Sequence, residues 1–229
     1  RLSRVSKLGQ LSGALAHELR QPLTSILANA EAGARLLDED AAETDEMKEI
    51  LEDIISDDKR AAAIIAQLRQ LMTKGETNLT LIDLNEVVAA TMKLTSSEFL
   101  ARQTKVDFRR EARGLQVRGN LAQLQQIVLN LLLNAADAMA DLAPGERRIV
   151  LETRLREDGF RELTVSDRGP GVAPEARSEL FKPFVTSKAD GLGLGLAICR
   201  SIAQSHGGRL GFGDDQGPGA RLVLALPAP

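Results

Sequence analysis

The chain has 229 residues, 43% of them hydrophobic, and a formal net charge of -3. This apolar content, without a long low-complexity tract, predicts one or two folded domains and excludes a disordered chain. The negative charge and the 3% aromatic content, with neither Trp nor Tyr, argue against nucleic-acid binding, so we expect no nucleic-acid partner.

Cysteine content and targeting signals both bear on the compartment. Cys199 is the only cysteine, which excludes an intrachain disulfide and fits a reducing environment. Its position inside an apolar helical pattern predicts plain core packing. The chain has no run of about 18 apolar residues and no signal peptide, and it does not begin with Met. We therefore expect a soluble cytoplasmic fragment of a longer protein, without direct membrane contact in this fragment.

The first 75 residues show helical periodicity in two stretches. Apolar residues recur every three or four positions from Leu2 to Leu37 and again from Met47 to Met72, on either side of an acidic break. The short connection predicts an antiparallel helical hairpin. Because each apolar stripe is wide enough to need more than one neighbour, we predict that residues 1–75 pair with a second copy as a dimeric four-helix bundle.

Beyond residue 75 the pattern becomes mixed. Alternation of apolar and polar residues predicts short strands, and two of them, 105–109 and 115–118, are expected to pair as a hairpin or strand pair. Asp158-Gly159 and a later Gly-rich stretch predict the turns that join the remaining strands. The predicted strands are residues 79–82, 105–109, 115–118, 148–156, 161–166, 210–212 and 220–226.

Three helices are expected among these strands. Asp83 with Glu86, and likewise Asn120 with Gln123, offer an N-cap and a capping-box partner. The predicted helices are residues 83–99, 120–139 and 194–205. The middle one is apolar on more than one side, which predicts a sandwiched position. Strand pairs alternating with three helices predict an α/β sandwich with a mixed sheet for residues 76–229, so the fold class is α + α/β.

His206 ends the last predicted helix, just before Gly207-Gly208. The partial negative charge of a helix C-terminus favours a cation at this place. We expect a structural role for this histidine.

His17 is expected on the exposed side of the first helix. It lies two residues from both Leu15 and Leu19, so at about 100° per residue it points away from the buried stripe. Glu18 places a carboxylate beside the imidazole, where it can hold one ring N–H and leave the other nitrogen as a nucleophile. Pro22 removes an amide that would bond to the Glu18 carbonyl, which predicts a bend that gives another domain room to approach.

The segment Ala16-His-Glu-Leu-Arg-Gln-Pro-Leu-Thr24 resembles the H-box of two-component sensor histidine kinases, within their dimerisation and phosphotransfer domain. The resemblance implies that His17 is the phosphoacceptor and that Glu18 is its general base. Gln21 stands where many members have a Thr or Asn that positions water to dephosphorylate the partner regulator. Gln can still hold a water, but its extra methylene group shifts the position of the amide. The sequence therefore leaves open whether the chain acts as a phosphatase.

Asn130 and Asn134 lie four residues apart and therefore share one helix face. Their neutral oxygens suit Mg²⁺, which keeps several waters and leans on ligand phosphates. Taken by spacing alone, two amides that cap or pack locally explain the pattern equally well. The surrounding segment, residues 126–135, resembles the family's N-box, which implies that Asn134 ligates Mg²⁺ and that Asn130 lies close to the phosphates of ATP.

Asp167-Arg-Gly-Pro-Gly171 follows a predicted strand and resembles the family's first glycine box. In that family the aspartate accepts a hydrogen bond from the adenine amino group, a role that the resemblance implies for Asp167. Gly169 and Gly171 would let the backbone approach the base. A simple turn explains such a run equally well when it stands alone.

Three further segments resemble the family's ATP lid. Phe181-Lys-Pro-Phe184 resembles the F-box, a hydrophobic latch, while Thr186-Ser-Lys188 and Gly191-Leu-Gly-Leu-Gly195 resemble the lid and second glycine box. Glycine amides and the following helix N-terminus would hold phosphate anions, with a lysine as countercharge. The glycine spacing is not that of a dinucleotide fingerprint. The resemblance implies nucleotide contacts at Phe184, Thr186, Lys188, Gly191, Gly193, Gly195 and Leu196.

The resemblance implies Mg²⁺- and ATP-dependent phosphorylation of His17, followed by transfer to an aspartate in the receiver domain of a response regulator. Two alternatives stay open: a GHKL-fold ATPase, and an ATP-binding dimeric scaffold or phosphatase without autokinase activity. Hydrolytic relatives typically have a water-activating glutamate one turn before the Mg²⁺ asparagine, where this chain has Asn130. That residue and the helix of His17 argue against the ATPase.

Overall fold

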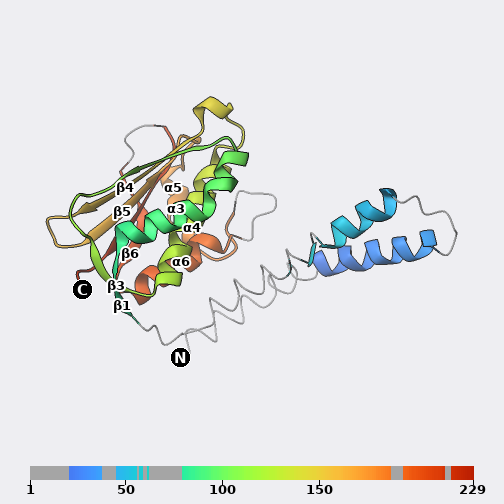
Figure 1. Ribbon diagram of the computed structural model, residues 1–229, viewed down its shortest axis with the longest axis horizontal. Helices are drawn as coiled ribbons and strands as arrows, with labels where there is room; N and C mark the ends of the chain where they lie inside the picture. Colours follow the sequence, from blue (N-terminus) through green and yellow to red (C-terminus); the bar gives the residue numbers. More distant parts are fainter. Residues whose placement is uncertain are drawn as a thin grey trace. The chain divides into compact units, whose positions relative to one another are not determined.

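The computed structural model describes residues 21–37, 45–55, 57–58, 61, 79–186, 193–214 and 218–229. The chain divides into two compact units, Arg1–Thr73 and Lys74–Pro229 (Figure 1). Across the described stretches, no helix combines the length and the apolar character needed to span a bilayer.

The first unit contains two helical stretches, residues 21–37 and 45–55. They pack closely at Gly33, where an added Cβ would stand 3.5 Å from Cγ2 of Ile50 and 3.6 Å from the sulfur of Met47. The predicted helical hairpin is confirmed over these stretches, whereas His17 and Glu18 lie outside the described residues. Several large apolar side chains of both helices stay exposed in the single chain, namely Leu23, Leu27, Leu37, Leu51 and Ile55.

A five-stranded mixed sheet forms the centre of the second unit, with the strand order β2-β4-β5-β7-β6 (Figure 1). β2 runs parallel to β4, while the β4–β5, β5–β7 and β6–β7 pairs are antiparallel. The mixed sheet predicted from the sequence is therefore confirmed. The strands of this unit are β1 (Thr80–Asp83), β2 (Lys105–Arg109), β3 (Gln116–Gly119), β4 (Arg148–Leu155), β5 (Arg161–Ser166), β6 (Arg209–Phe212) and β7 (Arg221–Leu226).

The predicted pairing of residues 105–109 with 115–118 is wrong. β2 pairs with β4, and β3 pairs antiparallel with β1 in a separate two-stranded sheet. Alternation determines which face of a strand is buried, but it does not select the partner strand. The connection between β2 and β3 is instead held by Asn85, whose Nδ2 donates to the carbonyls of Glu111 and Arg113, each at 3.4 Å.

Three long helices pack on one face of the sheet: α3 (Leu84–Ala101), α4 (Leu121–Ala138) and α6 (Gly195–Ser205) (Figure 1). α4 contacts α3 on one side, α6 on the other, and β4 and β5 beneath. This confirms the sandwiched position predicted for it, because five of its apolar side chains have no exposed surface. These are Leu124, Ile127, Val128, Leu131 and Leu132. The short segments α5 (Pro174–Arg177), η1 (Pro144–Glu146) and η2 (Glu179–Phe181) complete the unit.

Side-chain caps begin α3 and α4 as predicted. Oδ1 of Asp83 accepts the N–H of Asn85 at 2.9 Å, and Oδ1 of Asn120 accepts the N–H of Gln123 at 3.1 Å. The reciprocal half of each capping box is absent. Glu86 pairs instead with Arg110, just after β2. Oε1 of Gln123 is buried without a hydrogen-bond partner among the described residues.

His206 joins the C-terminus of α6 to the N-terminus of α4. The side chain is buried; Nδ1 lies 2.8 Å from the carbonyl of Ile202, and Nε2 accepts the N–H of Asn120 at 3.0 Å. Because Nε2 accepts an N–H bond, Nδ1 is the ring nitrogen placed to donate to the carbonyl of Ile202. The predicted structural role is confirmed, because the ring is buried and its two nitrogens contact the ends of both helices.

Replacing Asn85 tests the buried polar cluster that holds the β2–β3 connection. Asn85 has no exposed surface, and its Oδ1 accepts the hydroxyl of Thr153 at 2.7 Å. We expect Asn85→Ala to lower the free energy of unfolding by about 2 kcal/mol, because it leaves buried carbonyls and a hydroxyl without partners. Denaturant unfolding followed by circular dichroism measures this. Ser97→Ala, an exposed change on the same helix, should cost less than about 0.5 kcal/mol, and equal losses would contradict the explanation.

Candidate functional site

Asp167 directly follows β5 and is held by the β6–β7 hairpin. Its N–H donates to the carbonyl of Ala220 at 3.1 Å. Its Oδ1 accepts the N–H groups of Gly169 at 2.8 Å and of Ala220 at 3.1 Å. Within the described residues, Oδ2 accepts no hydrogen bond. One carboxylate oxygen is therefore fixed by backbone amides, and the other is left to receive a donor from a ligand.

The environment of Asp167 makes it a strong acceptor. Burial raises the pKa of this carboxyl, and the hydrogen bonds from Ala220 and Gly169 only partly oppose the rise. A partly desolvated carboxylate gains more from a ligand N–H than an exposed one, because it gives up less hydration when the ligand binds. The group is thus suited to recognise a donor such as an exocyclic amino group.

Three glycines bring separate segments close to Asp167. A Cβ added to Gly169 would stand 2.7 Å from the carbonyl oxygen of Ala138, at the end of α4. Gly219 has a φ of +100°, and a Cβ there would overlap the Asp167 carbonyl. Gly171, with a φ of +77°, would meet the carbonyl of Gly219 at 3.1 Å. The loop after β5, the end of α4 and the β6–β7 hairpin are therefore in mutual contact.

The sequence analysis identified Gly169 and Gly171 but missed Gly219 and Ala220. Their only local signal is a glycine just before a strand, which any hairpin turn shares. The role of these two residues comes from a contact with a residue about fifty positions earlier, so local pattern does not reveal it.

Both predicted asparagines lie half-buried on α4, on the side that meets α6. Nδ2 of Asn130 donates to Sγ of Cys199 at 3.4 Å. Nδ2 of Asn134 would stand 4.0 Å from a Cβ added to Gly195, the first residue of α6. The side of α4 that carries Asn130 and Asn134, which we call its amide face, therefore adjoins the N-terminus of α6. At such a terminus, backbone N–H groups and the helix dipole favour anions.

Cys199 has no exposed surface, so the predicted core packing is confirmed. Burial raises the pKa of its thiol to about 12, with the Asn130 amide opposing the rise. The sulfur is therefore a neutral thiol at physiological pH. The sequence analysis did not anticipate its contact with Asn130.

The stretches on either side of residues 187–192 are joined by a backbone hydrogen bond. The N–H of Phe184 donates to the carbonyl of Gly193 at 3.0 Å. Both residues have a positive φ, and a Cβ on Gly193 would stand 2.6 Å from the backbone nitrogen of Val185. Thr186 is exposed and Leu196 is half-buried, whereas Lys188 and Gly191 lie outside the described residues.

An aromatic pair anchors the segment before this stretch. Phe181 contacts Phe212 of β6 edge-on, with ring centroids 5.6 Å apart. The guanidinium of Arg200 lies 5.2 Å from the centre of the Phe181 ring, and that of Arg177 lies 5.8 Å from the Phe212 ring. The segment that resembles a hydrophobic latch is thus fastened to the sheet and to α6.

The structure brings five of the predicted ligand residues of the second unit into two connected groups. One contains Asp167, Gly169 and Gly171, and the other contains Asn134 with Gly195; the two are linked along α4 through Ala138. Gln21 is exposed on the helical stretch 21–37 of the first unit.

The donor set limits what metal the site could hold. Across the described residues, no group of three or more His, Cys, Asp or Glu side chains is placed to bind a metal ion. A metal beside α4 would therefore rely on amide oxygens and on the oxygens of a bound phosphate ligand. Those are the preferences of Mg²⁺, and the residues present fit that ion.

Comparison with known proteins matches two families in succession. Residues 7–77 match the His Kinase A (phospho-acceptor) domain. Residues 119–229 match the family described as histidine kinase-, DNA gyrase B-, and HSP90-like ATPase. The second match contains the asparagines, Asp167 and the glycine segments described above.

Individual relatives agree with the family matches. The chain is 37% identical over 208 residues to the C4-dicarboxylate transport sensor protein DctB of Rhizobium meliloti, covering 91% of this chain and 33% of that protein. It resembles full-length ShkA in complex with AMPPNP, with a TM-score of 0.68 and 26% identity over 97% of this chain and 45% of the other. Histidine kinase ThkA in complex with response regulator protein TrrA shares the fold, with a TM-score of 0.79 at 22% identity over 99% of this chain and 64% of the other. The chain spans between 23% and 48% of the length of these and similar curated relatives.

Gly219→Ala tests whether the hairpin positions Asp167. The added methyl group would collide with the Asp167 carbonyl, so we expect the dissociation constant for ATP to rise at least about tenfold. Gly159→Ala is the matched control, because Gly159 also has a positive φ, of +83°, but has nothing within 4 Å of the added Cβ. Calorimetric titration of both variants with ATP measures the effect. If both changes weaken ATP binding equally, backbone strain alone explains the loss.

Proposed function

This chain belongs to the two-component sensor histidine kinases, and we propose that it phosphorylates its own His17 from ATP and passes the phosphoryl group to an aspartate of a response regulator. In this proposal, residues 1–75 form the dimerisation and phosphotransfer domain. Residues 76–229 form the catalytic domain, which belongs to a family of ATP-binding domains.

The observation that carries the proposal is the junction of Asp167, the amide face of α4 and the N-terminus of α6. Oδ2 of Asp167 accepts the adenine amino group, while Gly169 and Gly171 keep side chains away from the base. At the other end of the site, Gly195 leaves the first turn of α6 open to phosphate oxygens. The same surface thus offers an acceptor for the base and donors for the phosphates, which is what ATP requires.

Phosphate contacts and metal binding follow from the side chains beside α6. We assign binding of the phosphates to Asn130, Thr186, Lys188 and the backbone amides of the second glycine segment. Phe184 and Leu196 are assigned other contacts with the nucleotide. Asn134 would hold Mg²⁺ through its side-chain oxygen, and the bound ion would neutralise phosphate charge. The contact with Cys199 engages Nδ2 of Asn130 and leaves its oxygen available to the site.

Transfer depends on positioning more than on covalent help from the protein. The unprotonated ring nitrogen of His17 attacks the γ-phosphorus and ADP departs, while Glu18 holds the N–H of the other ring nitrogen and stabilises the charge that develops on the imidazole. Charge neutralisation around the phosphates lowers the barrier further.

The first unit supports a homodimer. Its helices leave five large apolar side chains more than half exposed in the single chain. A second copy that covers them would complete a four-helix bundle, because two helices cannot enclose a core alone. Gln21, four residues after His17 in the sequence, is exposed in the single chain, and its amide could hold a water that dephosphorylates the regulator.

An ATPase is the main alternative, and Asn130 argues against it. This residue lies one turn before Asn134, and a carboxamide cannot take a proton from an attacking water as a glutamate does. A nucleotide-binding scaffold would need neither His17 nor Glu18.

Incubation with γ-labelled ATP separates the three possibilities. We expect acid-labile, base-stable label on the wild-type chain and no label on His17→Gln, because the acceptor nitrogen is gone. Arg35→Gln, an exposed change in the same unit, should keep the label. Release of free phosphate without labelled protein would support the ATPase, and neither product would support the scaffold.

Asp167→Asn tests recognition of the base. The amide oxygen can still accept from Gly169 and Ala220, but its NH₂ group then replaces Oδ2 and faces the adenine amino group. We expect ATP affinity to fall at least about tenfold. Because folding raises the pKa of Asp167, its ionised form is disfavoured in the folded state, so the change should not lower the free energy of unfolding at neutral pH.

The same carboxyl predicts a pH dependence. The raised pKa means that Asp167 takes up its proton at a higher pH than an ordinary aspartate, and the protonated form is a poor acceptor. The dissociation constant for ATP should therefore rise as the pH falls through this pKa. Asp167→Asn should lose that dependence and the exposed Asp141→Asn should keep it; a wild-type constant that stays flat with pH would rule out this role.

A further inference from the structure

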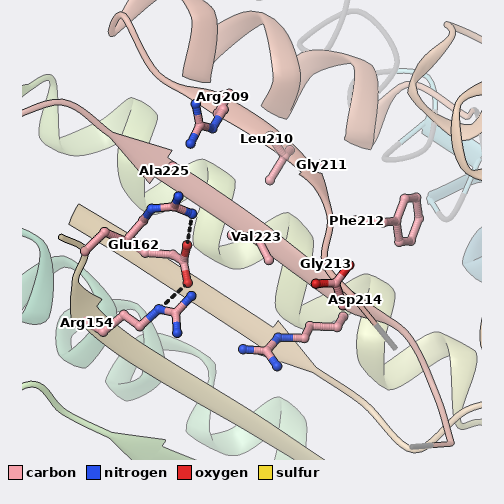
Figure 2. Close-up of a pocket in the computed structure, with 12 residues that line it drawn as sticks. Arg154, Glu162, Arg209, Leu210, Gly211, Phe212, Gly213, Asp214, Val223 and Ala225 are labelled. Carbon is pink, nitrogen blue, oxygen red and sulfur yellow. Dashed lines mark hydrogen bonds and ion pairs between the residues drawn. The ribbon is translucent and has the colours of Figure 1, made fainter. Parts of the chain in front are cut away.

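The face of the sheet opposite the helices carries a basic hollow, which we name the arginine groove. It is lined by Arg154, Arg156, Arg209 and Arg221, with short side chains between them, and has a volume of about 390 Å³ (Figure 2). Figure 2 shows Arg154 and Arg209 on opposite sides of Val223 and Ala225. None of the residues assigned to nucleotide binding lines it.

The charge of the groove is not balanced internally. Four arginines face three carboxylates, namely Glu162 and Asp214 in the lining and Asp158, which pairs with Arg156 and lies 3.8 Å from Arg209. The balance is a net charge of +1 in a chain whose own net charge is -3. The buried Glu162 is already occupied, since Nε of Arg154 lies 2.6 Å and Nη1 of Arg156 lies 3.0 Å from its oxygens. Burial alone would raise the pKa of Glu162, but these two arginines outweigh it and keep the carboxylate ionised.

Two of the four arginines can still bind an anion from outside the chain. Arg221 makes no ion pair within the described residues. Arg209 lies 3.8 Å from Asp158, a long contact, and Asp158 also pairs with Arg156 at 3.0 Å. Guanidinium groups present several N–H donors in a fork that matches a carboxylate, so both are suited to bind one.

The spacing of these cations favours an extended anion over a compact one. Arg154, Glu162, Ala225 and Arg209 are register neighbours across four strands, so the backbones of the two arginines lie about 14 Å apart. Arg221 lies four residues from Ala225 along β7, or about 13 Å. A single phosphate would require these arginine side chains to converge on one point, whereas successive carboxylates of an extended peptide can meet them separately along the groove.

We propose that the arginine groove docks a carboxylate-rich, extended segment of a partner protein. Short floor residues, Gly211, Val223 and Ala225, leave room for the backbone of such a segment, while the arginines at the sides pair with its carboxylates. Nucleic acid fits less well, because only one aromatic residue, Phe212, lines the groove and two carboxylates lie within it. Exposed ion pairs are individually weak, so binding needs several of them and weakens with salt.

A binding experiment with the full chain tests the proposal without relying on phosphoryl transfer. The probe is a fluorescein-labelled oligoglutamate peptide followed by anisotropy at low ionic strength, with an oligoglutamine peptide of equal length as the neutral control. We expect saturable binding of the acidic peptide only. In the double variant Arg209→Gln, Arg221→Gln, its dissociation constant should rise about tenfold, because two of the pairing cations are lost.

The matched control is the double variant Lys105→Gln, Arg109→Gln, which removes two cations from β2 at the other edge of the sheet. It should bind the peptide as the wild type does, and ATP titration reports whether each variant remains folded. Equal weakening in both double variants, or absence of binding by the wild type, overturns the proposal. Stronger binding of a single-stranded oligonucleotide of equal charge would assign the groove to nucleic acid and overturn it as well.

Discussion

The backbone hydrogen bonds between Asp167 and Ala220 join the loop after β5 to the start of β7, and the site depends on them. The N–H of Ala220, together with that of Gly169, holds one oxygen of the Asp167 carboxylate and leaves the other open. The backbone hydrogen bonds also require a residue without a side chain at Gly219, because its Cα lies against the Asp167 carbonyl. A hairpin at the end of the chain therefore determines the orientation of a carboxylate some fifty residues earlier.

α4 serves the core and the site at the same time. Its apolar sides are buried against α3, α6 and the sheet, while Asn130 and Asn134 occupy the side that meets the start of α6. Because the apolar contacts leave the helix little freedom to rotate, the two amides keep one orientation relative to α6. Ala138, at the end of the same helix, approaches Gly169, so one rigid element connects the two ends of the site.

Much of the fold was predictable because its signals are local. The caps at Asp83 and Asn120 depend on residues two or three positions away, and the helix and strand periods depend on short windows. Partner choice is not local: the pattern of residues 105–109 predicts a strand but not its parallel pairing with β4. His206 shows the same limit, since its place at a helix end does not reveal the hydrogen bond that its ring accepts from the N–H of Asn120. In the site, the glycines and asparagines carried recognisable motifs, whereas Ala220 and Cys199 act through contacts that no motif records.

The buried thiol has a practical consequence for spectroscopy. Alkylating reagents attack thiolates, and a group with a pKa of about 12 and no exposed surface offers them almost none. Cysteines introduced elsewhere could thus be coupled selectively to spin labels or fluorophores while the native residue stays in place. Distances between such labels, measured with and without nucleotide, would then report the arrangement of the two units.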